Sequence, residues 1–234
     1  MIRLSLALLV FSVFGVGCNN NRPIEDEPER ISDVNPNMIW FDYQVTGEEG
    51  NDSVTVKLQY RAGEEGPTLQ LTDPSKVEID GKEIKFNATK ITGPYYEMQF
   101  PANNFSGEHL ISFTNLKNKR YDEKFSYHPI SLQAEVPAIM KRGTIIFQLK
   151  GLSPGGRVRI LMNDTAYASE GINRLDTISN GQIIITEQDL EKLSNGPIQF
   201  VLIRENERDV NEGTREGGRI AITYSLKREF ILED

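Results

Sequence analysis

The chain has 234 residues, with 26 lysines and arginines against 34 aspartates and glutamates, so its formal charge is −8. An acidic chain binds nucleic acid poorly, because contact with phosphates requires clustered basic side chains. The sequence contains one cysteine and two histidines, which excludes an internal disulfide and a zinc site built from several cysteines. We therefore expect no nucleic acid among its partners, no metal and no cofactor, and a fold stabilised by packed apolar cores.

The first residues have the order of a signal peptide. Arg3 precedes an apolar run from Leu4 to Phe14, which is shorter than the roughly 20 residues that a membrane-spanning helix needs. The small residues 15–17 (Gly-Val-Gly) then lead directly to Cys18, the single cysteine. The alternative is a buried N-terminal strand or helix with an inert core cysteine, but no turn or cap separates the run from residue 1.

This arrangement resembles the lipobox of bacterial lipoproteins, although Gly15 stands where leucine is usual. The resemblance implies cleavage of the signal peptide, residues 1–17, and lipidation of Cys18, including palmitate. Two or more acyl chains would anchor the protein stably in a membrane. Asn19 in place of aspartate after the cysteine implies the outer membrane, with either a periplasmic or a surface-exposed location in the cell envelope. Loss of Arg3 would leave 25 basic and 34 acidic residues and a formal charge of −9.

Residues 18–37 are expected to form the lipidated cysteine and a disordered tether. They are polar, interrupted by proline and poor in large apolar groups, so burial cannot offset the entropy of ordering them. Their acidic group resembles an export signal of Bacteroidota lipoproteins, and a plain solvated linker is the alternative; it comprises Glu25, Asp26, Glu27 and Glu29.

From residue 38 onward apolar residues alternate with polar ones, which is typical of half-buried strands. The alternation runs through about seven short segments to residue 128, with an Asp80-Gly81 pair that favours a type I′ hairpin turn. A second alternating series fills residues 129–234, and Thr186 begins one short helical connector with a capping-box order. We therefore predict an all-β protein with two tandem immunoglobulin-like or fibronectin-like β-sandwiches, at 38–128 and 129–234, after the cleaved signal peptide and flexible tether.

The lipobox-like cysteine, the acidic tether and the tandem sandwiches together resemble envelope lipoproteins of the Bacteroidota. Three Asp-Ser or Asp-Thr triplets also resemble the O-glycosylation sequon of that group, with Ser53, Thr165 and Thr177 as acceptors. Ordinary turn chemistry is the alternative, because Asp, Ser and Thr are frequent turn residues.

We expect no catalytic residues. The sequence lacks HExxH, GxSxG, an EF-hand loop and a phosphate-binding loop. His109 shares the parity of the core positions Ile111 and Phe113, which predicts a partly buried, hydrogen-bonded side chain, and His128 lies at the boundary between the two units. A carboxylate-dependent envelope hydrolase is an alternative, but two small sandwiches rarely place two carboxylates on either side of a sugar.

Two outward aromatic residues are the candidate binding residues. Strand parity points Trp40, the single tryptophan, and Tyr95 away from the core, where aromatic rings can anchor a partner or stack on sugars. The alternative is that other residues cover them, or that Trp40 is core and the register differs by one. The charged segment 204–218 is expected to be a long loop of the second unit and a candidate for partner contact, far from the membrane if the two units extend in series.

These features predict a lipid-anchored envelope protein with a non-catalytic binding, adhesion or scaffold role. Its partners would be the membrane and an envelope protein or a glycan, and a glycan-binding accessory lipoprotein is the alternative within the binding class.

Overall fold

The computed structural model describes residues 28–152, 155–166, 169–178 and 180–234. The predicted signal peptide, Cys18 and the tether up to residue 27 lie outside the described residues. The rest of the predicted tether, residues 28–37, is not disordered, because Ile31 is buried in the first core and its amide donates to the Gln70 carbonyl at 2.9 Å. The strands are β1 (Ile39–Glu48), β2 (Ser53–Ala62), β3 (Lys76–Ile79), β4 (Lys82–Glu83), β5 (Phe86–Thr89), β6 (Gly93–Pro101), β7 (Gly107–Thr114), β8 (Arg120–Tyr127), β9 (Ser131–Leu132), β10 (Ile139–Lys141), β11 (Ile145–Lys150), β12 (Arg157–Asn163), β13 (Ile172–Thr177), β14 (Gln182–Ile185), β15 (Gly196–Asp209) and β16 (Gly218–Glu233). One short helix, α1 (Glu187–Leu190), and three 3-10 turns at Ile31–Asp33, Pro36–Met38 and Ala102–Asn104 accompany them.

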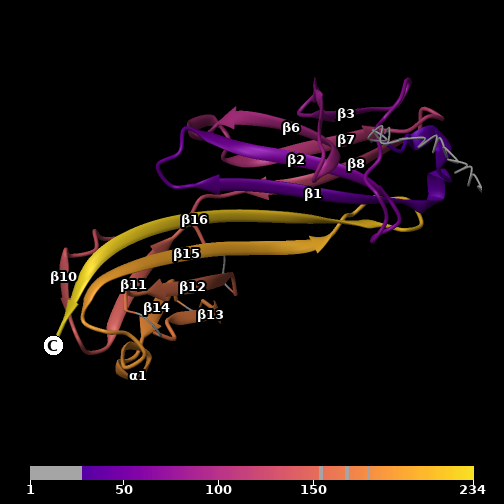
Figure 1. The fold of residues 1–234 in the computed structure, drawn as a ribbon. Helices are drawn as coiled ribbons and strands as arrows, with labels where there is room; N and C mark the ends of the chain where they lie inside the picture. Colours follow the sequence, from indigo (N-terminus) through magenta and orange to yellow (C-terminus); the bar gives the residue numbers. More distant parts are fainter. Residues whose placement is uncertain (1–27, 153–154, 167–168, 179) are drawn as a thin grey trace, which may run out of the picture.

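A nine-stranded sheet runs through the whole described molecule in the order β13-β12-β15-β16-β1-β2-β6-β5, with β10 also paired to β16. Two smaller sheets, β4-β3-β7-β8 and β14-β11-β9, complete two β-sandwiches with it (Figure 1). The predicted all-β class with two sandwiches is confirmed.

Each sandwich has its own apolar core. In the first, Phe41 of β1 lies edge-on to Phe113 of β7 with ring centroids 5.2 Å apart, and Tyr43 is fully buried beside it. In the second, Phe147 of β11 stacks on Phe200 of β15 with centroids 4.5 Å apart. Both pairs come from facing sheets, so the core positions that the alternation predicted are the ones that hold the sheets together.

Strand β16 belongs to both sandwiches. Its first half pairs in parallel with β1, from Gly218 opposite Phe41 to Ser225 opposite Glu48, whereas the whole strand pairs antiparallel with β15. Ile220 and Ile222 are buried in the first core, while the later Leu226 is buried in the second. The alternation had assigned all of β16 to the second unit. It shows which face a side chain takes, but it does not show which strand lies alongside.

Local turn chemistry agrees with the sequence in two places. Asp80 and Gly81 have φ of 49° and 76°, as the predicted type I′ turn requires. Helix α1 has the predicted capping box, in which the Thr186 hydroxyl accepts from the Asp189 amide and the Asp189 carboxylate accepts from the Thr186 amide. Strand β8 ends at Tyr127 and β9 begins at Ser131, so no strand crosses residue 128.

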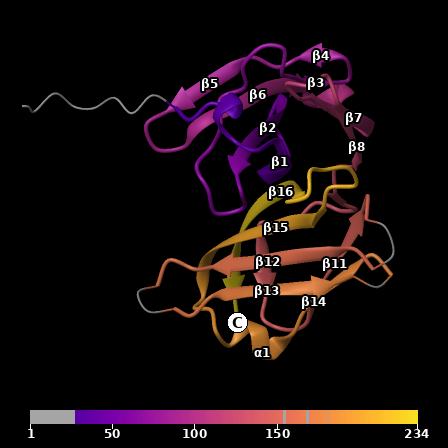
Figure 2. The ribbon, with the colours of Figure 1, turned by 90° about the vertical axis from the view of Figure 1, so that its right-hand side faces the viewer.

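The expectation of a long, free loop at 204–218 was wrong. Residues 204–209 continue β15, and the connection 210–217 packs on the first sandwich (Figure 2). The Thr214 hydroxyl donates to the Ile39 carbonyl at 2.7 Å. The buried carboxylate of Glu123 on β8 accepts from the Asn211 side-chain amide at 2.9 Å and from the Arg208 guanidinium at 2.7 Å. These contacts make the segment part of the first sandwich.

Candidate binding surface

The face of the nine-stranded sheet opposite the two cores is the candidate binding surface, and we call it the outer face. The even-numbered residues of β16 contribute side chains to both cores. Both cores therefore lie on the same side of the sheet. The odd-numbered positions of β16, such as Arg219 and Thr223, therefore share the outer face with Asp42 of β1 and Glu205 of β15. Since β16 joins the sandwiches without a break, this face is continuous from one to the other.

One hollow of the outer face surrounds Trp40. It measures about 180 Å³ and is lined by Trp40, Asp42, Arg61, Glu64, Glu65 and Arg219. Trp40 is half-buried, lies opposite Arg61 in the register and does not belong to either core cluster. A Cβ atom placed on Gly217 would lie 3.9 Å from the indole ring, so the tip of the β15–β16 hairpin borders the tryptophan on one side.

The buried carboxylate of Asp42 positions two arginine side chains of this hollow. Asp42 is only 2 % exposed, and its oxygens lie 3.1 Å from the Arg219 Nε and 3.6 Å from an Arg61 terminal nitrogen. The hydrogen bond and the negative charge of Asp42 raise the pKa of Arg219. Asp42 thus holds two guanidinium groups beside the indole, while both retain other N–H donors.

Tyr95 lies on the same face but not in the same hollow. It is half-buried, and the Lys57 ammonium lies 4.9 Å from its ring centroid. Gln59 of the adjacent strand β2 is almost fully buried and donates to the Thr92 carbonyl at 3.1 Å. Two strand spacings of about 4.8 Å each separate β1 from β6, so the two predicted aromatic residues form two separate contact points.

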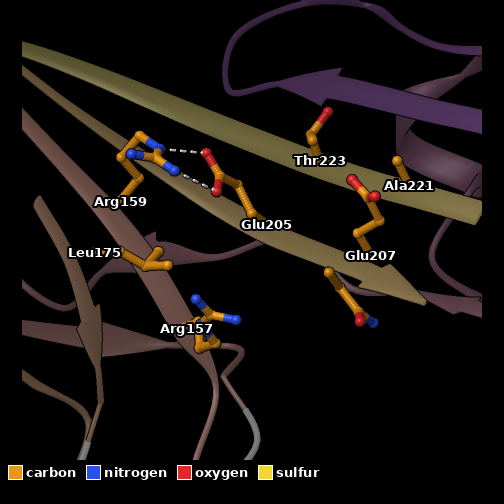
Figure 3. Close-up of a pocket in the computed structure, with 8 residues that line it drawn as sticks. Arg157, Arg159, Leu175, Glu205, Glu207, Ala221 and Thr223 are labelled. Carbon is orange, nitrogen blue, oxygen red and sulfur yellow. Dashed lines mark hydrogen bonds and ion pairs between the residues drawn. The ribbon is translucent and has the colours of Figure 1, made fainter.

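A larger hollow lies where the sheet passes from one sandwich to the other (Figure 3). It measures about 500 Å³ and is lined by Arg157, Arg159, Leu175, Glu205, Asn206, Glu207, Ala221 and Thr223. The Arg159 guanidinium donates two hydrogen bonds to Glu205, at 2.6 and 3.1 Å, and this raises the pKa of Arg159. The Arg157 side chain is exposed and makes no hydrogen bond or ion pair within the described part of the chain.

Sequence reasoning missed this second hollow. Its side chains come from β12, β13, β15 and β16, which are distant in sequence and meet only through strand pairing. The one available signal was the alternation of β15, in which the even-numbered residues face the core. Glu205 and Glu207 therefore had to face outward.

The three predicted glycosylation acceptors lie apart from each other. Ser53 is half-buried at the start of β2, whereas Thr165 and Thr177 are exposed. The Asp164 carboxylate before Thr165 accepts from the backbone amides of Ser194 and Ala166, at 2.5 and 2.9 Å, and the Ser194 hydrogen bond lowers the pKa of Asp164 most. That aspartate therefore has a turn role of its own, and glycosylation at the three sites stays a prediction.

His109 is held by structural contacts. Its Nδ1 lies 2.8 Å from an Asp80 carboxylate oxygen and its Nε2 lies 3.1 Å from the Phe105 carbonyl oxygen, while the ring stacks on Phe105 at 3.9 Å. Within the described ranges, no group of three or more His, Cys, Asp or Glu side chains could hold a metal ion. No helix of the described chain has the length and apolar character to cross a membrane.

No protein-family model matches the chain, and no curated protein matches it. Among solved structures, DIP-gamma IG1+IG2 is 8 % identical to this chain. The match covers 79 % of this chain and 97 % of the DIP-gamma chain, with a TM-score of 0.23. The fibronectin(III)-like modules of Clostridium thermocellum CbhA are 11 % identical, with 81 % and 94 % coverage and a TM-score of 0.24. SGBP-B of Bacteroides ovatus, in complex with a mixed-linkage heptasaccharide, is 11 % identical, with 81 % and 60 % coverage and a TM-score of 0.18. At such low TM-scores the fold assignment rests on the strand pairing above.

Proposed function

We propose that this chain is a non-catalytic binding, adhesion or scaffold protein of the bacterial cell envelope, anchored in the outer membrane through lipidated Cys18. The observation that carries the binding role is the continuous outer face, which presents two open hollows with charged side chains on one shared sheet. Arginine and tryptophan are the residue types most often found at the energetic centre of protein interfaces. Both hollows contain arginine, and one contains the single tryptophan.

The carboxylates of the larger hollow favour binding over the hydrolase alternative. A glycosidase needs one protonated carboxyl group as a general acid opposite a second, ionised one. Both oxygens of Glu205 instead accept hydrogen bonds from the Arg159 guanidinium, so this carboxylate is already engaged within the protein. Glu207 is 59 % exposed to water and lies 3.5 Å from Arg219, so both carboxylates of the hollow are paired with arginine.

The anchor is tested by labelling cells with a palmitate analogue. The Cys18→Ala variant should lose the label and should no longer partition into detergent, because Cys18 is the single cysteine of the chain. Persistence of both properties in the variant would contradict lipidation at this residue.

The binding surface is tested by site-specific photo-cross-linking in cell envelopes. A photoreactive residue replacing Arg157 on the outer face should give a discrete cross-linked product. The matched control replaces Ile146, an exposed residue of β11 on the small sheet of the second sandwich. Identical cross-linking from both positions, or none from the outer face, would contradict the assignment.

A glycan is the second candidate ligand, and the Trp40 hollow favours it. An indole beside guanidinium donors and the exposed carboxylates of Glu64 and Glu65 offers a ring surface together with donors and acceptors for hydroxyl groups. A glycan array probed with the wild type and with Trp40→Ala should show glycans that only the wild type retains. Equal retention by both proteins, or no retained glycan, would leave the protein-partner role in place.

A further inference from the structure

The connection between β5 and β6 projects an apolar side chain into solvent. Thr89 pairs with Gly93 across the hairpin, and Gly93 has a φ of 63°, which closes the three-residue turn 90–92. The Thr89 hydroxyl accepts from the Thr92 amide at 2.9 Å and lies 2.7 Å from the Thr92 hydroxyl. The turn is therefore built from its own polar groups, and Ile91 at its tip remains 96 % exposed.

Basic residues and a second apolar residue lie along the same edge strand, from the start of β5 to its turn. Phe86 at the start of β5 is 42 % exposed and packs edge-on against Tyr96 at 5.9 Å. Lys85 and Lys90 are exposed and make no ion pair within the described residues. In a chain with a net charge of −8, this edge of the sheet combines lysines with exposed apolar side chains. We call Lys85, Phe86, Lys90 and Ile91, which extend along the β5 edge to its turn, the hairpin tip.

The described chain begins beside the same hairpin. The Gln70 amide donates to the Glu29 carbonyl at 2.8 Å, and the Ile31 amide donates to the Gln70 carbonyl at 2.9 Å. Two residues before Gln70, the Thr68 hydroxyl donates to the Thr92 carbonyl at 3.3 Å. Figure 2 shows the indigo start of the chain next to β5 and β6. Residue 28, where the described chain begins, is ten positions after Cys18. This segment can span at most about 35 Å.

We propose that the hairpin tip docks on the lipid bilayer that holds the anchor, with Ile91 and Phe86 among the headgroups and the lysines against anionic phosphates. This inference rests on the proposed anchoring at Cys18. Apolar side chains flanked by lysines suit the interface between water and hydrocarbon, where both can be satisfied. The short tether supplies the high local concentration that such a small contact needs. Docking would fix the orientation of the first sandwich relative to the membrane.

A lipid surface fits the tip better than a protein partner does. The apolar residues stand on a projecting turn and a sheet edge, with lysines as immediate neighbours in sequence, whereas a protein partner is usually bound through a broad patch of packed residues. The place where the described chain begins adds a second, independent reason, since the anchor confines this side of the molecule to the vicinity of a bilayer.

The test uses the mature chain with Cys18→Ser, so that Ile91→Cys supplies the single thiol for an environment-sensitive fluorophore. An N-terminal polyhistidine tag in place of residues 1–17 attaches the protein to vesicles of phosphatidylethanolamine and phosphatidylglycerol that contain a nickel-chelating lipid. We expect the emission of the label to shift to the blue on attachment and to be quenched by bromine-labelled acyl chains. The matched control carries the label at Ile146, which is 54 % exposed in the second sandwich, and should show neither effect.

Several outcomes would overturn the proposal. Emission unchanged by vesicle attachment would do so, and so would an equal response of the two labels. A blue shift at high protein concentration without vesicles would assign the tip to a second copy of the chain instead. Exchange of Lys85 and Lys90 for glutamine should weaken the response severalfold, and an unchanged response would remove the electrostatic contact. The polyhistidine tag replaces acylation in this test. A negative fluorescence result therefore does not affect the palmitate test of Cys18, and a negative palmitate result does not affect the fluorescence test.

Discussion

Successive residues of β1 have different roles because their side chains point alternately to the core and to the outer face. Phe41 and Tyr43 are fully buried in the first core, whereas Trp40 and Asp42 alternate with them on the outer face. Asp42 is nevertheless almost completely buried, since Arg61 and Arg219 cover its carboxylate. The outer face therefore contains side chains that are fixed in position without belonging to the apolar core.

Replacing Trp40 tests this division. Trp40→Ala should lower the free energy of unfolding by about 1–2 kcal/mol, because a half-buried side chain loses only part of its packing. Phe41→Ala should cost about 3–5 kcal/mol, the usual range for emptying a buried aromatic site. Urea denaturation followed by circular dichroism gives both values, and equal losses would place Trp40 in the core.

Asp164 should make stability depend on pH. The Ser194 amide, and to a smaller extent the Ala166 amide, lower the pKa of Asp164 in the folded protein. Its contribution is therefore complete above the unfolded pKa of about 3.9 and is lost as the pH falls through the lower folded pKa. Asp164→Asn should destabilise the protein by about 1 kcal/mol at pH 7, and this difference should shrink towards pH 2.

The control for this pH dependence is Asp52→Asn, which changes an exposed aspartate whose side chain has no hydrogen bond or ion pair in the described chain. Urea midpoints of the three proteins between pH 2 and pH 7 measure the effect. A stability difference for Asp164→Asn that is constant over this range would refute the assignment.

At the scale of elements, the β15–β16 hairpin is the feature that joins the sandwiches. It starts in the second core, and its tip is held on the first sandwich by Glu123, which receives hydrogen bonds from Arg208 and Asn211. Gly218 permits the close pairing with β1, since a Cβ atom there would lie 2.4 Å from the Phe41 carbonyl oxygen. The hairpin is thus fitted to the first sandwich by close backbone approach at β1 and by a buried charge on β8.

Glu123→Gln should loosen the connection 210–217 between β15 and β16. The variant removes a buried charge that receives several hydrogen bonds, so we expect a loss of about 2 kcal/mol in unfolding free energy. Amide hydrogen exchange should become faster in residues 210–217. Glu212→Gln is the matched control, because Glu212 is exposed and accepts one hydrogen bond, from the Asp122 amide. Equal effects of the two changes would show that the buried contact does not hold the hairpin.

At the scale of the whole molecule, the shared sheet makes the first sandwich depend on the end of the chain. Without β16, β1 would expose an unpaired edge, and the first core would lose Ile220 and Ile222. The same continuity turns the outer face into one surface, which two independently mobile domains could not provide.

A fragment comprising residues 28–130 should accordingly be less stable than the first sandwich within the whole chain, and it should tend to aggregate through the β1 edge. Residues 28–234 should unfold in a single cooperative transition with a β-rich circular dichroism spectrum. Denaturation curves and sedimentation of both proteins provide the measurement. A monomeric fragment with the urea midpoint of the whole chain would contradict this dependence.

The sequence by itself determined the strand periodicity, the Asp80-Gly81 turn, the capping of α1 and the outward parity of Trp40, because each depends on neighbours within a few residues. Only the tertiary structure decided that Ile220 lies opposite Tyr43 in the first core and that Glu205, Arg159 and Thr223 line one hollow. These contacts join segments far apart in the chain, and the hydrogen bonds between strands use backbone groups that nearly every residue possesses. Alternation therefore specifies the face of a strand, whereas the fit of complete sheets selects its partner.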